Sequence, residues 1–521
     1  MAVQKGSVKE LGARTAHVAT FLMLGQLVST ILAGIAFIII ARILGPGTYG
    51  IYTLAIAVSA LFGAVGDFGI GTAFNKFISE YRAHDRINSI EKLLADGFAT
   101  VVIVGLLFAL LTLLFSGLLA STVMHDASYA YIVDVVSLIV FLSLLYTPAY
   151  SALVGFGKGA YVAVIMASQT LVQAVIGITL ALYGFGAVAP IIGIISGFVV
   201  GISIAIYYLY VKLGMKLRAP SFARIRKLMG FSLPLAASNV LGAISNNFSL
   251  LFLGIFVLPA IIGYIGVATR TISILGILTG SISLSILPMF SSTLTTGMKR
   301  HIGRIYNYSM YVAFLLITPV ILFIAVLAKP FVVTVFSATY GGSALFVAII
   351  GIGTLIGLVG SYTSMLLISA SKVRKVLKYN AIMVFVELAL MPLFVIELKG
   401  LGFVLLFYAL APILLFALYV RAASSVLNIK LQWRRILKVV TASLISAAFM
   451  IPLVLLFGSN YIPLLVAALA EQLVLYPAII AFTGAARRRD LANLSSLMSS
   501  IPLFGYVISI IARYALIFSR N

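Results

Sequence analysis

The sequence predicts an all-α membrane protein with about 14 transmembrane helices, arranged as two parallel six-helix lobes around a central cavity plus two extra C-terminal helices. First, 63% of the 521 residues are hydrophobic and only 9% are charged, whereas about 25% of a soluble domain is charged. Second, apolar runs of the length that spans a bilayer recur along the whole chain, and the mean hydropathy is +1.20. Third, Lys and Arg gather in alternate loops.

Charged, Pro-rich and Gly-rich breaks separate the apolar spans. The expected spans are 18–42, 49–76, 93–123, 129–156, 160–184, 187–211, 231–256, 262–289, 306–328, 341–370, 376–397, 400–422, 438–458 and 461–484. The loops between them are too short for a soluble domain. The apolar stretch 501–512 is short and ends at Arg513, so it is expected to form an interfacial helix rather than a fifteenth span.

The first two spans form a hairpin within residues 36–81. A Gly45-Pro46-Gly47 turn joins them, and the second helix is apolar except for Asp67. This hairpin is the unit that the rest of the chain repeats.

The basic residues predict the orientation of the spans. Of the 35 Lys and Arg residues, 31 fall in one set of alternate loops, while the opposite loops hold Arg42, Lys329 and Lys399, and Arg270 lies inside a span. By the positive-inside rule both termini are cytoplasmic, which requires an even number of spans. The net charge of +23 therefore reflects topology, and no nucleic-acid partner is expected because no basic soluble domain exists.

An internal repeat relates the two halves of the chain. A shift of 213 residues places the first two spans on the seventh and eighth, and a shift of 214 places the fourth and fifth on the tenth and eleventh. Repeats six spans apart keep the same orientation, so the two lobes are expected to be parallel. The matched pairs include Gln26 with Asn239, Pro46 with Pro259, Gly50 with Gly263, Lys158 with Lys372, and Gln173 with Glu387. The expected divisions are an N-terminal lobe at 1–211, a basic linker at 212–230, a second lobe at 231–422, two added spans at 423–484 and a basic tail at 485–521.

The motifs A-R-I-L-G-P-x-x-Y-G-x-Y at 41–52 and D-F-G-I-G at 67–71 carry a resemblance. With the two-lobe pattern, the chain resembles the polysaccharide-transporter branch of the multidrug/oligosaccharidyl-lipid/polysaccharide exporter superfamily. The resemblance implies a flippase of the cell membrane that translocates a polyprenyl-(pyro)phosphate-linked oligosaccharide by alternating access. The chain is more distantly similar to the lipid II flippases, but their extra arginines are missing from 30–40, which argues against lipid II as the cargo.

Two other functions compete with the flippase. A drug or small-molecule cation antiporter of the same superfamily would need a cluster of acids in one lobe, and the acids here are scattered. A membrane-embedded polymerase or ligase would need a long external loop. Neither a catalytic constellation nor a phosphate-binding loop is present, so we expect no enzyme activity, cofactor or metal site.

Arg270 is the main candidate for cargo binding. It is the one Lys or Arg deep within an expected span, where a basic residue costs about 2.5–3.5 kcal/mol on insertion scales. It could meet the lipid pyrophosphate in the cavity, because the arginine fork matches phosphate oxygens. The alternative is an ion pair with an intramembrane acid.

Amides and acids complete the candidate set. Substrate-binding residues expected beside Arg270 are Gln26, Gln173, Asn239, Asn246 and Asn247; hydrogen bonding between helices is their structural alternative. Acids that could couple transport to protons or sodium, or pair with Arg270, are Asp67, Glu387 and Glu471. For Asp67, which lies beside Gly66 and Gly69, helix packing or capping at a helix break is the favoured interpretation. The expected partners are the lipid-linked cargo, the bilayer and a coupling ion, and the protein is expected to be a monomer.

Overall fold

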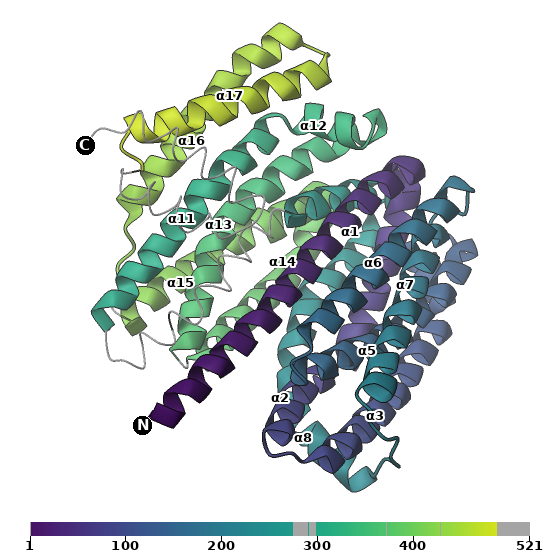
Figure 1. The fold of residues 1–521 in the computed structure, drawn as a ribbon. Coiled ribbons are helices and arrows are strands. Elements are labelled where there is room, and N and C mark those ends of the chain that lie inside the picture. The colour runs from purple at the N-terminus through teal and green to yellow at the C-terminus, as the bar shows by residue number, and fades with distance from the viewer. Residues whose placement is uncertain (1, 275–289, 291–298, 371, 428, 487–521) are drawn as a thin grey trace. The chain divides into compact units, whose positions relative to one another are not determined.

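The computed structural model describes residues 2–274, 290, 299–370, 372–427 and 429–486. Side chains at 2–17, 19, 227, 231–239, 299–301, 426 and 427 lie outside the description. All regular elements in the described residues are helices (Figure 1). The chain forms two compact units, Met1–Gly266 and Val267–Asn521, and this division falls inside the segment 231–422 expected to be the second lobe. The expected lobe boundaries stay predictions.

The first unit is built from long helices joined by short turns. Its elements are α1 (Ala2–Gly66), α2 (Ile70–Ala83), α3 (Ile87–Leu114), α4 (Ser116–Val123), η1 (Ala127–Tyr129), α5 (Ala130–Gly155), α6 (Gly159–Leu182), α7 (Val188–Ile206), η2 (Tyr207–Lys212), α8 (Phe222–Ala243), η3 (Ile244–Phe248) and α9 (Ser249–Phe256). Helix α6 packs between α1 and α7, and α5 packs against α2, α3 and α7 (Figure 1).

Helix α1 is two helices joined at a kink. Gly45 has φ 68° and ψ 169°, a conformation that residues with a Cβ rarely adopt, and Pro46 follows it. Proline suits the first position of a helix because its missing N–H has no partner there anyway. The Gly-Pro-Gly turn expected between the first two spans therefore lies at this kink.

The second span is interrupted, and the expectation of one continuous helix over 49–76 was wrong. Helix α1 ends at Gly66 and α2 begins at Ile70. The Asp67 carboxylate accepts a hydrogen bond from the Gly69 N–H at 3.0 Å. An Asp side chain that accepts from the N–H two residues further on forms an Asx turn, which competes with a continuous helix and so favours a break at this position.

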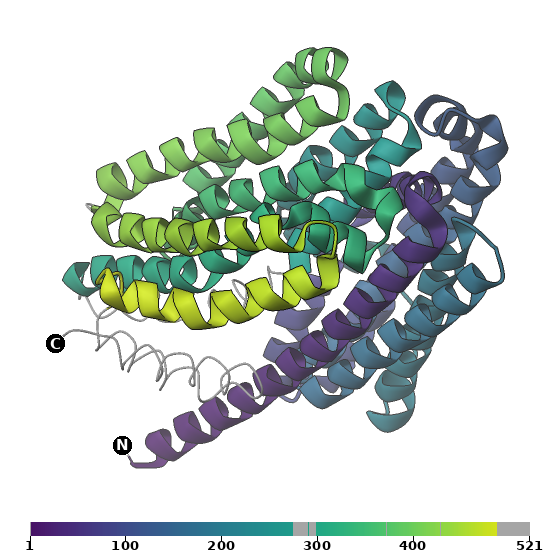
Figure 2. The ribbon, with the colours of Figure 1, turned by 90° about the horizontal axis from the view of Figure 1, so that it is seen from above.

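The second unit continues the helical pattern. A helix over residues 259–274 enters it, and its later elements are α11 (Lys299–Val326), α12 (Ala328–Val335), η4 (Ala338–Ser343), α13 (Ala344–Ser369), α14 (Val373–Leu405), η5 (Leu406–Leu410), α15 (Ala411–Leu427), α16 (Trp433–Phe457) and α17 (Tyr461–Phe482). Helix α14 contains a kink at Lys399, where φ is 50°. The yellow helices α16 and α17 lie side by side (Figure 2).

The helices are consistent with a multi-pass membrane protein. Ten described helices are long and apolar enough to cross a bilayer, and 240–256 and 259–274 form two shorter apolar helices. Two of the ten, 20–66 and 373–425, each cover two of the expected spans. Residues 275–289, which would complete the eighth span, and the tail after 486 lie outside the described residues, so the count of fourteen stays a prediction.

Candidate functional site

Arg270 lies near the end of the described helix over 259–274, in the second unit. Its side chain is exposed, whereas Val267 and Ala268 just before it are fully buried. It has no hydrogen bond or ion pair with any described residue. A guanidinium on an apolar helix must face water, headgroups or protein. An exposed, unpaired Arg270 is therefore available to an anionic ligand.

The exposed amides lie on two helices of the first unit. Gln26 is exposed on α1, and its Nε2 donates to Thr30 Oγ1 at 3.3 Å. Asn246 is exposed in η3, and its Nδ2 donates to the Gly242 carbonyl at 2.8 Å. Asn247 beside it is partly buried, and the side chain of Asn239 lies outside the description. The segment η3 is π-helical, a distortion frequent at functional sites.

Gln173 differs from these amides because its partner is another side-chain amide. Gln169 Nε2 donates to Gln173 Oε1 at 2.9 Å, across one turn of α6. Both side chains are partly buried. Its role in cargo binding stays a prediction.

The three candidate acids have different surroundings. Asp67 accepts the Gly69 N–H in the break before α2 and is partly buried. Glu387 is only 7% exposed in α14, within electrostatic range of Tyr408 in η5. Glu471 in α17 has both carboxylate oxygens buried and without a hydrogen-bond donor among the described residues. Pairing of any of these acids with Arg270 stays a prediction.

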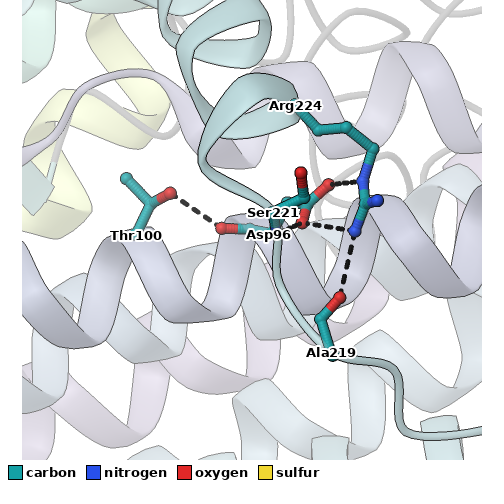
Figure 3. A network of polar contacts seen from close by, with 5 residues as sticks. All are labelled: Asp96, Thr100, Ala219, Ser221 and Arg224. Atoms are coloured by element: carbon teal, nitrogen blue, oxygen red, sulfur yellow. Dashed lines mark hydrogen bonds and ion pairs between the residues drawn. The ribbon is translucent and has the colours of Figure 1, made fainter.

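A polar network that the sequence did not predict holds the basic linker against α3. Asp96, only 3% exposed, accepts hydrogen bonds from Arg224 Nε at 2.6 Å and Nη2 at 3.0 Å. It also accepts one from the Ser221 N–H at 2.8 Å. Arg224 Nη2 donates further to the Ala219 carbonyl at 3.0 Å (Figure 3). Hydrogen bonding to the Asp96 carboxylate raises the pKa of the Arg224 guanidinium.

A second acid anchors the linker one turn earlier on α3. Glu91 is 5% exposed; its carboxylate accepts from Arg218 Nε at 2.8 Å and from the Lys216 N–H at 3.1 Å. Two acids five residues apart thus fix three basic residues of the linker. We call Glu91, Asp96, Arg218 and Arg224 the linker clamp. The signal available in the sequence was the two acids at the start of the expected span 93–123, which the expected topology puts on the same side of the membrane as the most basic loop.

The family profile described as "Polysaccharide biosynthesis protein" matches residues 17–294. The fold is similar to that of a lipid II flippase MurJ in an inward closed conformation, at 14% identity and a TM-score of 0.72, covering 90% of this chain and 99% of that one. It is also similar to an inward-facing multidrug resistance MATE family transporter of the MOP superfamily, at 17% identity and a TM-score of 0.64, covering 78% and 99%.

A third solved structure, a MOP superfamily transporter from Pyrococcus furiosus, is 17% identical with a TM-score of 0.55, covering 80% of this chain and 96% of that one. No curated protein matches the chain. At these identities the structural similarities establish the fold alone.

Proposed function

Because the chain belongs to the polysaccharide biosynthesis protein family and has the fold of MOP superfamily transporters, we propose that it is a flippase. Its cargo is an oligosaccharide linked to a polyprenyl (pyro)phosphate, which it moves across the cytoplasmic membrane by alternating access. The family match over residues 17–294 is the observation that carries this proposal. The MurJ neighbour, itself a lipid II flippase, supports a lipid-linked cargo on this fold.

Arg270 is the residue to which we assign the cargo phosphate. Its guanidinium is exposed and has no ion pair among the described residues. It presents a planar fork that matches phosphate oxygens in two parallel hydrogen bonds. The polar amides would contact the sugars, whose hydroxyls both donate and accept. The residues proposed for this role are Gln26, Gln173, Asn239, Asn246 and Asn247.

Energy for transport would come from an ion. Glu387, Asp67 and Glu471 are the candidate groups for proton or sodium coupling, and Glu387 is the strongest because it is buried in a membrane helix. Burial disfavours the charged form of a carboxylate, so a buried carboxylate is suited to take up and release a proton. In this scheme the lobes at 1–211 and 231–422 move around the cargo, both termini are cytoplasmic, and the protein acts as a monomer.

A cation antiporter is the second candidate, because a multidrug resistance transporter shares the fold at a TM-score of 0.64. The exposed charge of Arg270 favours the flippase. A cationic drug would be repelled by this guanidinium, whereas a phosphate would be attracted to it.

Reconstitution distinguishes the two functions. Proteoliposomes carrying a fluorescent lipid-linked oligosaccharide would be treated with a glycosidase that cannot cross the membrane. A flippase would expose glycan that is otherwise protected in the inner leaflet, and the rate of glycosidase cleavage measures this exposure. A gradient of a cationic dye should leave the rate of cleavage unchanged. Proteoliposomes that translocate the dye but leave the glycan protected would establish the antiporter instead.

A further inference from the structure

Three tyrosines and two lysines form a continuous strip at one end of the first unit. Tyr161 of α6 and Tyr208 of η2 stack with ring centroids 4.0 Å apart and ring planes 4° from parallel. Tyr207 lies 5.8 Å from Tyr208. Lys158 Nζ lies over the Tyr161 ring at 5.7 Å, and Lys212 Nζ lies over the Tyr207 ring at 6.0 Å. We call these five residues the basic aromatic strip.

The π-helical segment η2 explains this arrangement. In an α-helix, residues five apart lie on different sides of the helix, because each residue advances about 100°. A π turn forms i→i+5 hydrogen bonds and so brings residues five apart close together on one side. Tyr207 and Lys212 are the first and last residues of η2. The local distortion therefore places the ammonium group over the ring.

The strip lies where two lipid-facing helix surfaces end. Helices α6 and α7 with η2 are long and apolar enough to cross a bilayer, and each exposes a row of large apolar side chains. These are Val164, Leu171 and Val175 on α6, and Val199, Ile206 and Val211 on α7 and η2. Tyr207, 46% exposed, continues the second row. Tyrosine and lysine at the end of an apolar row are typical of the depth of lipid headgroups.

Both lysines are free to bind an anion. Lys158 and Lys212 are exposed, and neither forms an ion pair with a described carboxylate. The cation–π contact restrains each ammonium group but leaves N–H donors available, because the ring meets only one side of it. The strip thus presents two oriented positive charges beside amphipathic rings.

We propose that the basic aromatic strip binds the phosphates of anionic phospholipids of the surrounding bilayer. The two lysines contact headgroup phosphates, the tyrosine hydroxyls donate to headgroup oxygens, and the apolar rows below the strip pack against the acyl chains. The bilayer is the occupant because the exposed apolar rows lead directly to the strip. This site does not depend on the identity of the transported cargo.

The internal repeat supplies a natural comparison. A shift of 214 residues places Lys372 at the position of Lys158, but it replaces Tyr161, Tyr207 and Tyr208 by Lys375, Arg421 and Ala422. Lys372 and Lys375 are exposed and basic without an aromatic contact among the described residues. The strip is therefore not needed to build a lobe of this type, and the second copy provides matched lysines for a control.

The test uses the full-length protein in phosphatidylcholine vesicles with spin-labelled phosphatidylglycerol or spin-labelled phosphatidylcholine. Electron paramagnetic resonance measures the fraction of each lipid immobilised by the protein. Each lysine is expected to contribute about fivefold to the preference for the anionic lipid. Lys158→Gln/Lys212→Gln should lose this preference, whereas Lys372→Gln/Lys375→Gln, which removes the same charge, should retain most of it.

Two further measurements test the geometry of the basic aromatic strip and the source of the phosphate that it binds. Tyr208→Leu, which keeps both charges but removes the stack, should weaken the preference, and Lys158→Arg/Lys212→Arg should keep it. Equal losses in the strip and control double variants would overturn the proposal in favour of general surface charge. Displacement of the spin-labelled lipid by a small amount of polyprenyl phosphate would overturn it in favour of the cargo.

Discussion

Gly50 and Gly263, which the internal repeat pairs, lie in reciprocal contact with each other's neighbouring proline. A Cβ at position 50 would lie 1.7 Å from the Pro259 carbonyl oxygen, and a Cβ at position 263 would lie 2.0 Å from the Pro46 carbonyl oxygen. Pro46 and Pro259 are themselves a repeat pair. Two equivalent turns therefore pack backbone to backbone, and only glycine permits this approach at either position.

Alanine at either glycine should disrupt this contact. Gly50→Ala and Gly263→Ala are each expected to destabilise the protein by about 1–3 kcal/mol, because backbone must move to admit the methyl group. The double variant should cost less than the sum, since both changes break one contact. Denaturant unfolding of the purified protein measures this.

Gly47 is the matched control for this contact. It lies on the same turn, but a Cβ there would have no atom within 4 Å. Gly47→Ala should leave stability nearly unchanged. A loss of stability at position 50 as small as that at position 47 would show that the turn tolerates side chains and that the close approach is not important.

The linker clamp predicts an ordered series of stabilities. Asp96→Ala should be most destabilising, because it leaves Arg224 and the Ser221 N–H without their shared acceptor. Arg224→Gln should be milder, since the Arg224 side chain is 40% exposed and screened by solvent. Arg226→Gln, an exposed neighbour outside the clamp, should have no effect. Equal melting temperatures of Arg226→Gln and Asp96→Ala would show that the linker clamp does not stabilise the protein.

The Glu387→Gln variant tests whether transport is coupled to proton exchange at this residue. Glu387→Gln should fold, because the repeat places Gln173, a neutral amide of similar shape, at the equivalent position. If the carboxylate exchanges protons, transport should fall and lose its dependence on pH. Glu397→Gln, an exposed site on the same helix, should behave as wild type. Transport that keeps its full pH dependence in Glu387→Gln would exclude proton coupling at this residue.

Cysteine labelling tests the orientation, and the chain has no native Cys. Leu217→Cys, at an 83% exposed position in the basic linker, should react with an impermeant maleimide only from the cytoplasm. Ser459→Cys, exposed between α16 and α17, should react only from outside. Labelling of Leu217→Cys from outside would reverse the proposed topology.

Local features of the fold were well predicted because they depend on neighbouring residues. Apolar length and sparse charge predicted the membrane helices, and Gly45 before Pro46 predicted a turn where α1 is kinked. The repeat predicted that Gly50 and Gly263 are equivalent positions. It could not predict that they touch, because equivalence says nothing about distance.

Contacts between residues that are far apart in the sequence could not be predicted from local sequence patterns. Asp96 and Arg224 are 128 residues apart, and the linker cations were interpreted only as topology signals. The π-helical segments η2 and η3 also escaped prediction, because one turn of altered hydrogen bonding leaves the hydrophobic pattern nearly intact. Gly66 and Gly69 beside Asp67 favoured helix packing or a break there, but the expected span 49–76 still ran through it because the apolar run continues on both sides.

The most direct test of the proposed function is the translocation rate of a lipid-linked oligosaccharide in proteoliposomes containing Arg270 variants. Arg270→Ala should fold but lose most translocation, and Arg270→Lys should recover only part of it, because lysine lacks the fork that engages two phosphate oxygens. Arg421→Ala, which removes an exposed arginine elsewhere in the second unit, should retain the wild-type rate. Wild-type translocation by folded Arg270→Ala protein would contradict the assignment of Arg270 to the cargo phosphate.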